Sequence, residues 1–420
     1  MPTPYARTSA KSCSGSKSHS CNVLALISSL GASGPWCGFG KPKSRIGDFD
    51  ADLAPPVDRA TMVGVPDLRD LGWTDHFARA FAPWAEPGVV AGRVALEHNH
   101  VLRVLTESGE QLAEVSGRVR HEAAGRQDMP AVGDWVVLRL DDGGRCQIRA
   151  VLPRTGRFAR KAAGDSTQAQ VVAANIDTVF LVSGLDGDFN PRRIERYLML
   201  SRESGATPVV ILNKADVADD VDEAVALVEG LAPGVPVLAI SAADGRGFER
   251  LEPYLQPGKT VALLGSSGAG KSSIVNRLVG SKVLPTRSVR ESDSRGRHAS
   301  VHRQMIALPG GALVIDTPGM RELQLWGVDP GASDTFSDVA DLAAGCRFRD
   351  CRHQQEPGCA VKAAVEAGAL DAARYESFVK LDDERVTLER RREERALLEQ
   401  KRKGKILGRA IKAMQKDRDR

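Results

Sequence analysis

Gly265-Ser266-Ser267-Gly268-Ala269-Gly270-Lys271-Ser272 is the stretch of this chain that decides its fold. The apolar run Thr260–Leu264 precedes it, and Ser273 and the helical pattern Ile274–Leu278 follow it. Glycines let backbone N–H groups wrap around phosphates, the lysine places charge on the outer phosphates, and the serine hydroxyl can bind Mg²⁺. A chance glycine-rich turn is the alternative, but the order of strand, loop and helix favours a phosphate-binding loop. The stretch therefore predicts a nucleotide-binding α/β domain.

A second motif, Asn213-Lys214-Ala215-Asp216, concerns the base of the nucleotide. The carboxylate of Asp216 can accept both N–H donors of guanine, which adenine does not offer. Lys214 can lie along the base, and Asn213 can tie the loop to its neighbours. A helix cap at Asp216 is the alternative interpretation. Ser241-Ala242, after a predicted strand over 235–240, fits the loop whose backbone amide meets the guanine oxygen, so GTP and GDP are the expected ligands.

The third motif, Asp316-Thr317-Pro318-Gly319, ends a predicted strand over 312–315. Asp316 can hold Mg²⁺ through water, and Gly319 can turn its amide toward the terminal phosphate. Many GTPases place a glutamine beside this glycine to orient the attacking water, whereas this chain has Met320, which has no suitable donor or acceptor. Hydrolysis of GTP then has to recruit another side chain.

The order of the three motifs is unusual. An ordinary GTPase carries the phosphate loop first and the guanine-reading motif last, whereas here the guanine-reading motif comes first. This order predicts a circular permutation. Strands expected over 176–182, 208–212, 235–240 and 260–264, with helices over 191–203 and 219–231, predict a parallel sheet covered by helices on both faces. Ligands of such sheets bind at the carboxyl ends of the strands, where the motifs fall.

Residues 86–158 have a different pattern of short apolar alternations separated by turn residues. The expected strands lie over 88–94, 100–105, 111–115, 133–138 and 145–151. About five strands in so short a segment favour a small β-barrel of the OB type, a fold that often binds nucleic acid. A generic small barrel without a ligand is the alternative.

Composition sets broad limits on the class of protein. The chain has 420 residues and a formal net charge of +4, so two or three domains are expected, and the charge alone does not imply nucleic acid. Residues 1–47 contain no Asp or Glu; a disordered tail or a true start near Met62 is expected, with a signal peptide or transit segment as alternatives. No apolar run is long enough for a membrane span.

The cysteines indicate a metal site rather than a disulfide framework. Three of the 7 cysteines cluster with a histidine in Cys346-x4-Cys351-x-His353-x5-Cys359. Four such ligands match a closed, tetrahedral structural zinc site, with one Zn²⁺ per chain. Buried cysteines without a ligand are the alternative, but Arg347, Arg349, Asp350 and Arg352 make the segment too polar for a core.

The C-terminal part is predicted to be helical and basic. Charged residues at helical spacing over 384–409 favour a long solvated helix. Lys401–Lys416 contains seven basic residues and no acidic one. Together with the arginines of the Cys/His cluster, this charge can contact RNA phosphates, while a solvated helix remains an even alternative over 384–400.

Taken together, these motifs resemble the ribosome small-subunit-dependent GTPase A family over residues 66 to about 400. The features that carry the resemblance are the permuted GTPase motifs after a small barrel, Gly296-Arg297-His298 before the Asp316 strand, and the Cys/His cluster after it. The resemblance implies an OB domain, a permuted GTPase domain, a zinc domain and a role in late maturation of the small ribosomal subunit. The segment before residue 62 lies outside it.

The resemblance also suggests a replacement for the missing glutamine. By position, His298 is the candidate to orient or activate water, and imidazole suits this role near neutral pH; a structural switch-loop histidine is the alternative. The family usually has two threonines after this histidine, whereas this chain has Ala299-Ser300. Ser300 can still offer a hydroxyl to Mg²⁺, beside Ser272.

We therefore expect a cytoplasmic, monomeric GTP hydrolase that is stimulated by the small ribosomal subunit and its rRNA. The expected parts are a disordered tail (1–65), an OB-type barrel (66–160), the permuted GTPase domain (161–328), a zinc-binding helical domain (329–400) and a basic tail (401–420). A GTP-regulated RNA-binding scaffold with incidental hydrolysis is the alternative, and a signalling GTPase would leave the barrel unexplained. We further hypothesise that the permutation couples the switches to the zinc domain.

Overall fold

The computed structural model describes residues 67–98, 101–140, 146–161, 169–284, 303–316 and 335–418. All of them belong to one compact unit, Pro55–Arg420. The predicted tail, residues 1–65, lies outside the described residues. Among the described residues, no helix combines the length and the apolar character that a membrane span needs.

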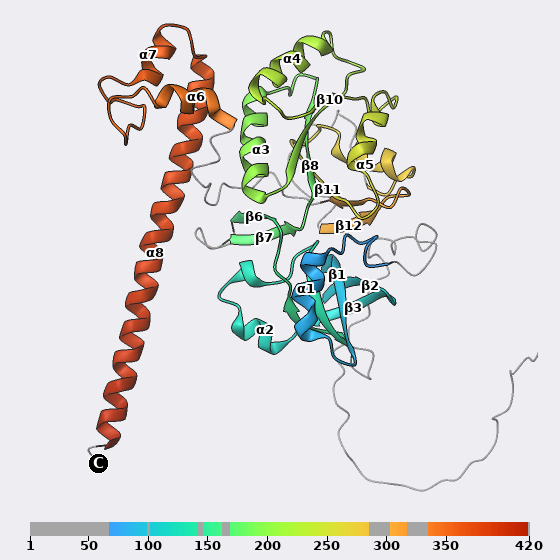
Figure 1. Cartoon of the computed structure of the whole chain (residues 1–420), viewed down its shortest axis with the longest axis vertical. Coiled ribbons are helices and arrows are strands. Elements are labelled where there is room, and N and C mark those ends of the chain that lie inside the picture. The colour runs from blue at the N-terminus through green and yellow to red at the C-terminus, as the bar shows by residue number, and fades with distance from the viewer. Residues whose placement is uncertain are drawn as a thin grey trace, which may run out of the picture. The chain divides into compact units, whose positions relative to one another are not determined.

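The N-terminal part is a closed five-stranded barrel (Figure 1). Its strands follow the order β1-β2-β3-β5-β4, and an additional β1–β4 pairing closes the ring, which confirms the predicted OB-type barrel. The elements are β1 (Val89–His98), β2 (Val101–Thr106), β3 (Gly109–Val115), α2 (Gly117–Glu122), η2 (Arg126–Asp128), β4 (Trp135–Leu140) and β5 (Cys146–Val151). Alternate residues such as Val94, Val104, Val136 and Ile148 fill the barrel interior, as the two-residue period of a strand requires.

A short helical segment covers one side of the barrel. Helix α1 (Asp75–Phe81) and the 3-10 turn η1 (Ala82–Trp84) precede the first strand. Trp73 packs edge-on against Trp135 of β4 with 4.6 Å between ring centroids, and Phe77 adds a second contact to the same ring at 5.7 Å. This aromatic cluster belongs to the main hydrophobic core, so the segment before the barrel is part of the fold.

The second part is a sheet with helices on both faces. Its strands lie in the order β10-β9-β8-β11-β13-β12; all neighbours pair in parallel except β12 and β13. The elements are β8 (Thr178–Gly184), α3 (Pro191–Ser204), β9 (Thr207–Asn213), α4 (Val221–Leu231), β10 (Val237–Ala239), η3 (Phe248–Tyr254), β11 (Thr260–Gly265), α5 (Lys271–Val279), β12 (Arg303–Ala307) and β13 (Leu313–Asp316). The strand that leads into the phosphate loop, β11, lies in the middle of the sheet although it comes fourth in sequence.

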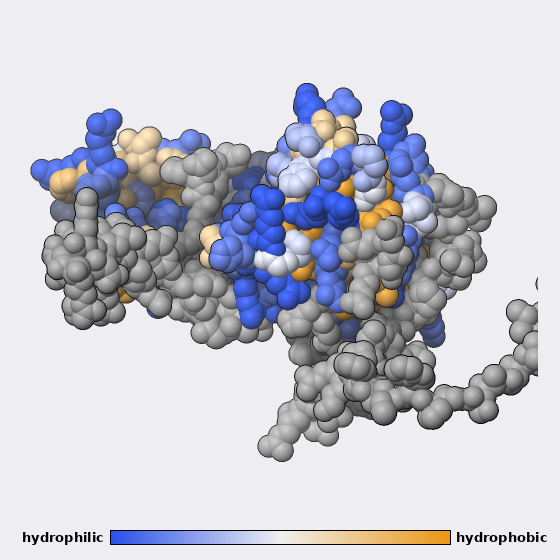
Figure 2. Space-filling view, turned by 90° about the horizontal axis from the view of Figure 1, so that it is seen from below, coloured by the Kyte–Doolittle hydropathy of each residue, from blue (hydrophilic) through white to orange (hydrophobic). Residues whose placement is uncertain are grey.

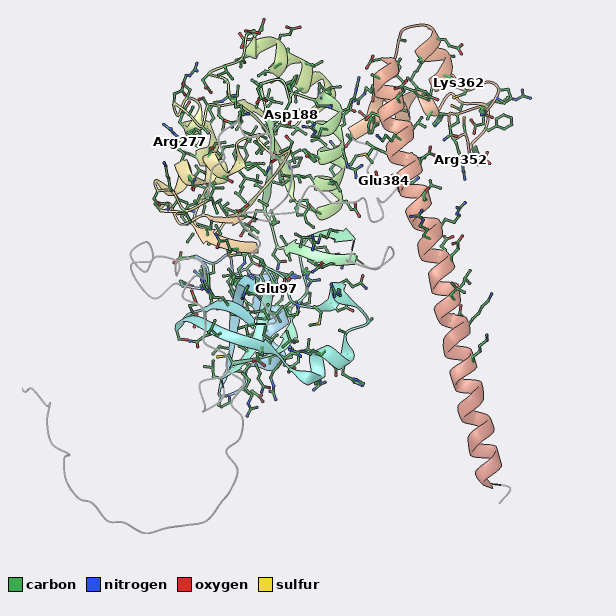
Figure 3. The ribbon with its side chains drawn as sticks, turned by 180° about the vertical axis from the view of Figure 1, so that it is seen from behind. Glu97, Asp188, Arg277, Arg352, Lys362 and Glu384 are labelled. Carbon is green, nitrogen blue, oxygen red and sulfur yellow. The ribbon has the colours of Figure 1, made fainter. Side chains whose placement is uncertain are left out.

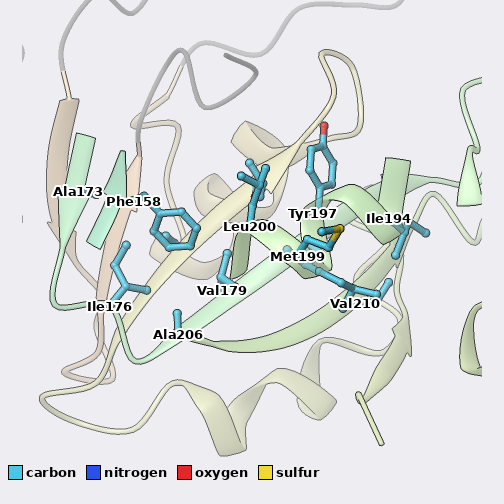
Figure 4. Close-up of a cluster of buried hydrophobic side chains, with 14 of the residues drawn as sticks. Phe158, Ala173, Ile176, Val179, Ile194, Tyr197, Met199, Leu200, Ala206 and Val210 are labelled. Atoms are coloured by element: carbon cyan, nitrogen blue, oxygen red, sulfur yellow. The ribbon is translucent and has the colours of Figure 1, made fainter. Parts of the chain in front are cut away.

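The central strands are buried on both faces, which explains their continuous apolar runs. On one face, Val179 and Leu181 of β8 pack with Ile194 and Leu198 of α3, and Figure 4 shows part of this cluster. On the other face, Phe180 and Val182 pack with the cluster that contains the buried residues of α5. Alternate residues of one strand therefore anchor α3 and α5 to opposite sides of the sheet.

Two features join the barrel to this sheet. Strand β1 pairs with β12 in antiparallel register, with Leu96 opposite Gln304. The guanidinium of Arg93, only 1% exposed, donates hydrogen bonds to the carbonyl oxygens of Leu71, Gly133 (3.2 Å) and Asn175 (2.9 Å). Burial lowers the pKa of Arg93 to about 10, so the side chain keeps its charge at neutral pH and links three segments.

A hairpin between the two parts was not expected from the sequence. Strand β6 (Arg157–Lys161) pairs with β7 (Ala169–Ala174) in a separate sheet. The predicted domain boundary after residue 160 therefore falls inside β6, and the exact limit between barrel and GTPase domain stays a prediction.

The C-terminal part is helical. Two short helices, α6 (Ser337–Ala343) and α7 (Ala360–Glu366), flank the Cys/His cluster, and α8 (Ala372–Arg418) follows with 47 residues. Helix α8 includes the segment predicted to be a long helix. On the face shown in Figure 2, the described residues are mainly hydrophilic, with small separate hydrophobic areas, so that face shows no broad apolar patch.

A candidate nucleotide site and a Cys/His cluster

The described residues of the three GTPase motifs lie at one edge of the sheet. Asn213 ends β9, Gly265 ends β11 and Asp316 ends β13. Because these strands run parallel to one another within one sheet, their carboxyl ends lie on the same side. The sheet therefore assembles residues that are more than a hundred positions apart in the chain.

The phosphate loop has backbone geometry that requires glycine. Gly268 and Gly270 have φ values of +82° and +97°, in the left-handed region that other residues adopt at a cost. A Cβ on Gly270 would lie 2.1 Å from Nδ2 of Asn213. Helix α5 begins at Lys271, whose Nζ donates to the carbonyl oxygens of Gly265 (2.8 Å) and Ser266 (2.6 Å). The Lys271 side chain therefore lies against the phosphate loop.

Asn213 joins the phosphate loop to the guanine-reading loops. Its side chain is 2% exposed; Nδ2 donates to the carbonyl oxygen of Ala269 at 2.9 Å, and Oδ1 accepts from the Ala242 amide at 3.0 Å. The Ser241 hydroxyl donates to the Asp216 carboxylate at 2.7 Å. Asp216 itself is exposed, so its carboxylate is held in one orientation while remaining accessible to a base.

Two aspartates that the sequence reasoning missed also lie at this edge. Lys214 forms an ion pair with Asp186. Asp188 accepts hydrogen bonds from Arg193 (2.7 Å) and from the Ser266 hydroxyl (2.6 Å), and these bonds lower the pKa of Asp188. The sequence could have indicated both aspartates by their position just after β8, because polar residues at the carboxyl end of a parallel strand lie next to the ligand site.

Asp316 is the part of the third motif that the structure describes. Burial raises the pKa of its carboxyl group, and the charge of Lys271 acts in the opposite direction. Gly319, Met320, His298 and Ser300 lie outside the described residues.

The Cys/His cluster has the geometry of a metal site. One ligand atom from each of Cys346, Cys351, His353 and Cys359 lies within 4.8 Å of the others. The Sγ atoms of Cys346 and Cys359 are 3.9 Å apart, and each is 3.5 Å from Nδ1 of His353. A tetrahedral ion with bonds of about 2.0–2.3 Å needs ligand separations of about 3.5–3.8 Å. The group can therefore bind a metal ion without large rearrangement.

The backbone and its neighbours hold His353 in this position. Its φ is +60°, which is uncommon for a residue other than glycine, and the Tyr375 hydroxyl of α8 donates to its carbonyl oxygen. Burial lowers the pKa of His353, which favours the neutral imidazole that binds metals. Helix α8 therefore supports the cluster directly.

The strand order and the three motifs define a circularly permuted GTPase. The family model described as RsgA GTPase matches residues 151–326. The chain is 52% identical over 334 residues to the small ribosomal subunit biogenesis GTPase RsgA of Opitutus terrae, covering 77% of this chain and 91% of the relative. The chain therefore belongs to the RsgA GTPase family and is a GTP-hydrolysing enzyme.

Two further comparisons agree. The chain is 46% identical over 299 residues to the small ribosomal subunit biogenesis GTPase RsgA 2 of Lactiplantibacillus plantarum, covering 71% of this chain and 84% of the relative. The crystal structure of YjeQ from Thermotoga maritima matches with a TM-score of 0.53 at 30% identity, over 71% of this chain and 99% of that chain. The family predicted from the permuted motifs is confirmed.

Proposed function

We propose that this protein hydrolyses GTP on the small ribosomal subunit and acts late in its maturation. The observation that carries the proposal is the 52% identity to an RsgA protein over 334 residues, which cover 91% of that relative. This chain has a barrel, a GTPase sheet and helices around the Cys/His cluster. The three parts belong to one compact unit, so the nucleotide state can influence what the other parts bind. A monomeric, cytoplasmic protein is the form that this role implies.

The residues at the sheet edge take the following roles in the proposal. Asp216 accepts the two N–H groups of guanine, with its orientation supported by Ser241 (2.7 Å). The amides of the phosphate loop cradle the phosphates, and Lys271 turns from its present carbonyl partners toward them. The GTP-binding set comprises Asn213, Lys214, Ala215, Asp216, Ser241, Ala242, the loop from Gly265 to Ser273, Asp316 and Gly319.

Two metal ions belong to the proposal. Mg²⁺ would bind with GTP, held by Ser272 and, through water, by Asp316, with Ser300 as a further ligand; it would neutralise charge on the phosphates. One Zn²⁺ would bind to the Cys/His cluster, since three thiolates and one imidazole form a closed structural site. His298 would orient the attacking water.

The surface around the Cys/His cluster supports contact with RNA. Arg347, Arg349 and Arg352 are exposed, and Arg352, which lies between Cys351 and His353 in the chain, is labelled in Figure 3. Phe348 is 42% exposed, and the Arg347 guanidinium lies 5.5 Å from its ring centroid. Arginines bind phosphates, and an exposed ring offers a stacking surface for an unpaired base.

Turnover of GTP with and without purified small subunits tests the proposal. We expect the subunit to raise turnover strongly, and His298→Ala to remove this stimulation while leaving the Kd for GTP nearly unchanged. Substitution of His302, which lies in the same segment, provides a matched histidine control. No large stimulation of the wild type would favour the RNA-binding scaffold, and full stimulation of His298→Ala would remove this residue from the mechanism.

A further inference from the structure

Arg277 connects the two ends of the candidate nucleotide site. It lies in α5, the helix that begins with Lys271 of the phosphate loop, and Figure 3 labels it. Its Nη1 atom donates to the carbonyl oxygens of Ala242 (3.3 Å) and Ala243 (3.2 Å), and Nη2 donates to that of Asp244 (2.8 Å). One guanidinium therefore holds three successive carbonyl groups of the loop that follows Ser241.

These carbonyl groups form the end of a single turn. The Gly245 amide donates to the carbonyl oxygen of Ser241 at 2.8 Å, and the Asp244 amide donates to the Ser241 hydroxyl at 3.2 Å. The exposed carbonyls at the end of such a turn carry partial negative charge, which a cation stabilises. Arginine suits this position because its planar fork offers several donors at once.

The loop is shaped around this side chain. Gly245 has φ +95°, and a Cβ at this position would lie 2.0 Å from Nη2 of Arg277. On another side, the guanidinium lies 5.5 Å from the ring centroid of Phe248. The absence of a side chain at Gly245 makes room for the guanidinium against the carbonyls, and the Phe248 ring lies on its other side.

The same loop carries the groups that would contact guanine. Ser241 holds the Asp216 carboxylate (2.7 Å), and the Ala242 amide is held by Asn213 (3.0 Å). A shift of the turn by a few tenths of an ångström would therefore move the amides that face the guanine oxygen, while the phosphate loop could stay in place.

We infer that Arg277 is a positioning residue for guanine specificity: it ties the loop that meets the guanine oxygen to the helix that carries the phosphate loop. The inference rests on the proposed GTP site. Arg277 would not touch the nucleotide. From the sequence alone, Arg277 is one charged residue on an exposed helix surface, and such residues usually only contact water.

Binding of three diphosphates to the full chain tests the inference. GDP and inosine diphosphate share the ring oxygen that the loop would meet, but only GDP has the amino group that Asp216 would read; ADP shares only the ribose and phosphates. Each Kd is measured by competition against a fluorescent GDP analogue for the wild type, Arg277→Ala and Arg277→Lys. Lys282→Ala is the matched control, because it removes an exposed positive charge just after α5.

For Arg277→Ala we expect the Kd values of GDP and inosine diphosphate to rise by the same factor, about three- to tenfold, which corresponds to the loss of hydrogen bonds from a charged group. The Kd of ADP should not change. Arg277→Lys should recover part of the loss, because an ammonium group cannot reach three carbonyls in fixed geometry. Lys282→Ala should match the wild type.

Three outcomes would overturn the inference: unchanged binding of GDP by Arg277→Ala, an equal loss for all three diphosphates, or a larger loss for GDP than for inosine diphosphate. The second would place the effect on the phosphate loop, and the third on Asp216. Failure of the proposed GTP site is distinguishable from all of these, because the wild type itself would then show no preference for GDP over ADP.

Discussion

Arg374 at the start of α8 donates a hydrogen bond to Glu195 of α3 at 2.8 Å. The carboxylate is completely buried and the arginine is 7% exposed. Arg374 also binds both carboxylate oxygens of Asp338 (2.5 and 2.8 Å), and Arg192 gives Glu195 a second partner at 2.7 Å. A buried charge network therefore joins the GTPase domain to the helices around the Cys/His cluster.

This network suggests a route for the coupling that the motif order led us to expect. Helix α3 begins just after Asp188, which binds the phosphate-loop serine, Ser266, and it carries Glu195 one turn further on. The hypothesis that the permuted switches couple directly to the metal domain concerns segment 317–334, which lies outside the described residues. Helix α3 offers a described connection between the same two sites.

Removing one partner of the Glu195–Arg374 pair should destabilise the fold strongly, whereas replacing both partners with apolar residues should destabilise it much less. We expect Arg374→Met to lower the free energy of unfolding by up to about 3–5 kcal/mol, because it removes the buried partner of Glu195 and leaves this buried carboxylate paired only with the partly exposed Arg192. Adding Glu195→Leu should recover much of this loss. Urea unfolding of the metal-loaded protein measures both. A double variant less stable than Arg374→Met would contradict the assignment of the cost to the stranded carboxylate.

The contact between Asp338 and Arg374 should lose its stabilising effect in acid. Burial alone would raise the pKa of Asp338, but hydrogen bonds and charge from Arg374 outweigh it and hold this pKa below its ordinary value. Such a carboxylate stabilises the fold above its unfolded pKa of about 3.9, and the stabilisation is lost as pH falls through the lower folded value.

We therefore expect the advantage of the wild type over Asp338→Asn in unfolding free energy to be constant from pH 7 to about pH 5 and to fall below about pH 4. Urea unfolding across this pH range measures it. Asp341→Asn, at an exposed carboxylate of the same helix, is the control; the same pH dependence in that variant would assign the effect to general charge.

Metal removal should loosen the C-terminal part and spare the sheet. We expect one zinc ion per chain by metal analysis, and chelation should raise hydrogen exchange over residues 346–366, because the four ligands hold this segment together. Exchange in β8 should change little. Cys359→Ser should lower the metal content, whereas Cys146→Ser, at a buried barrel cysteine, should keep it. A metal content well below one zinc per chain in the wild type would contradict the site.

Asp216 should determine the choice of base. Asp216→Asn replaces an acceptor with a donor, so the affinity for GTP should fall by about a hundredfold or more, while xanthosine triphosphate, which offers an acceptor at that position, should bind better. Asp219→Asn, at an exposed carboxylate close by in the chain, is the control. An Asp216→Asn protein that kept its preference for GTP would show that another group reads the base.

The sequence by itself determined the nucleotide motifs, their permuted order, the barrel and the four residues of the Cys/His cluster. These features depend on short-range patterns: a glycine-rich loop between a strand and a helix, alternating apolar residues, and cysteines spaced within one segment.

Only the tertiary structure decided which charged residues have structural or functional partners. Asp188, Glu195, Arg277 and Arg374 look like ordinary solvated charges on helices and loops. Their partners are up to 179 positions away, as for Glu195 and Arg374. Such contacts exist only after the hydrophobic faces of α3 and α5 have packed on the sheet, because this packing brings the partners within hydrogen-bonding distance. The same packing buries Glu195 and Arg374.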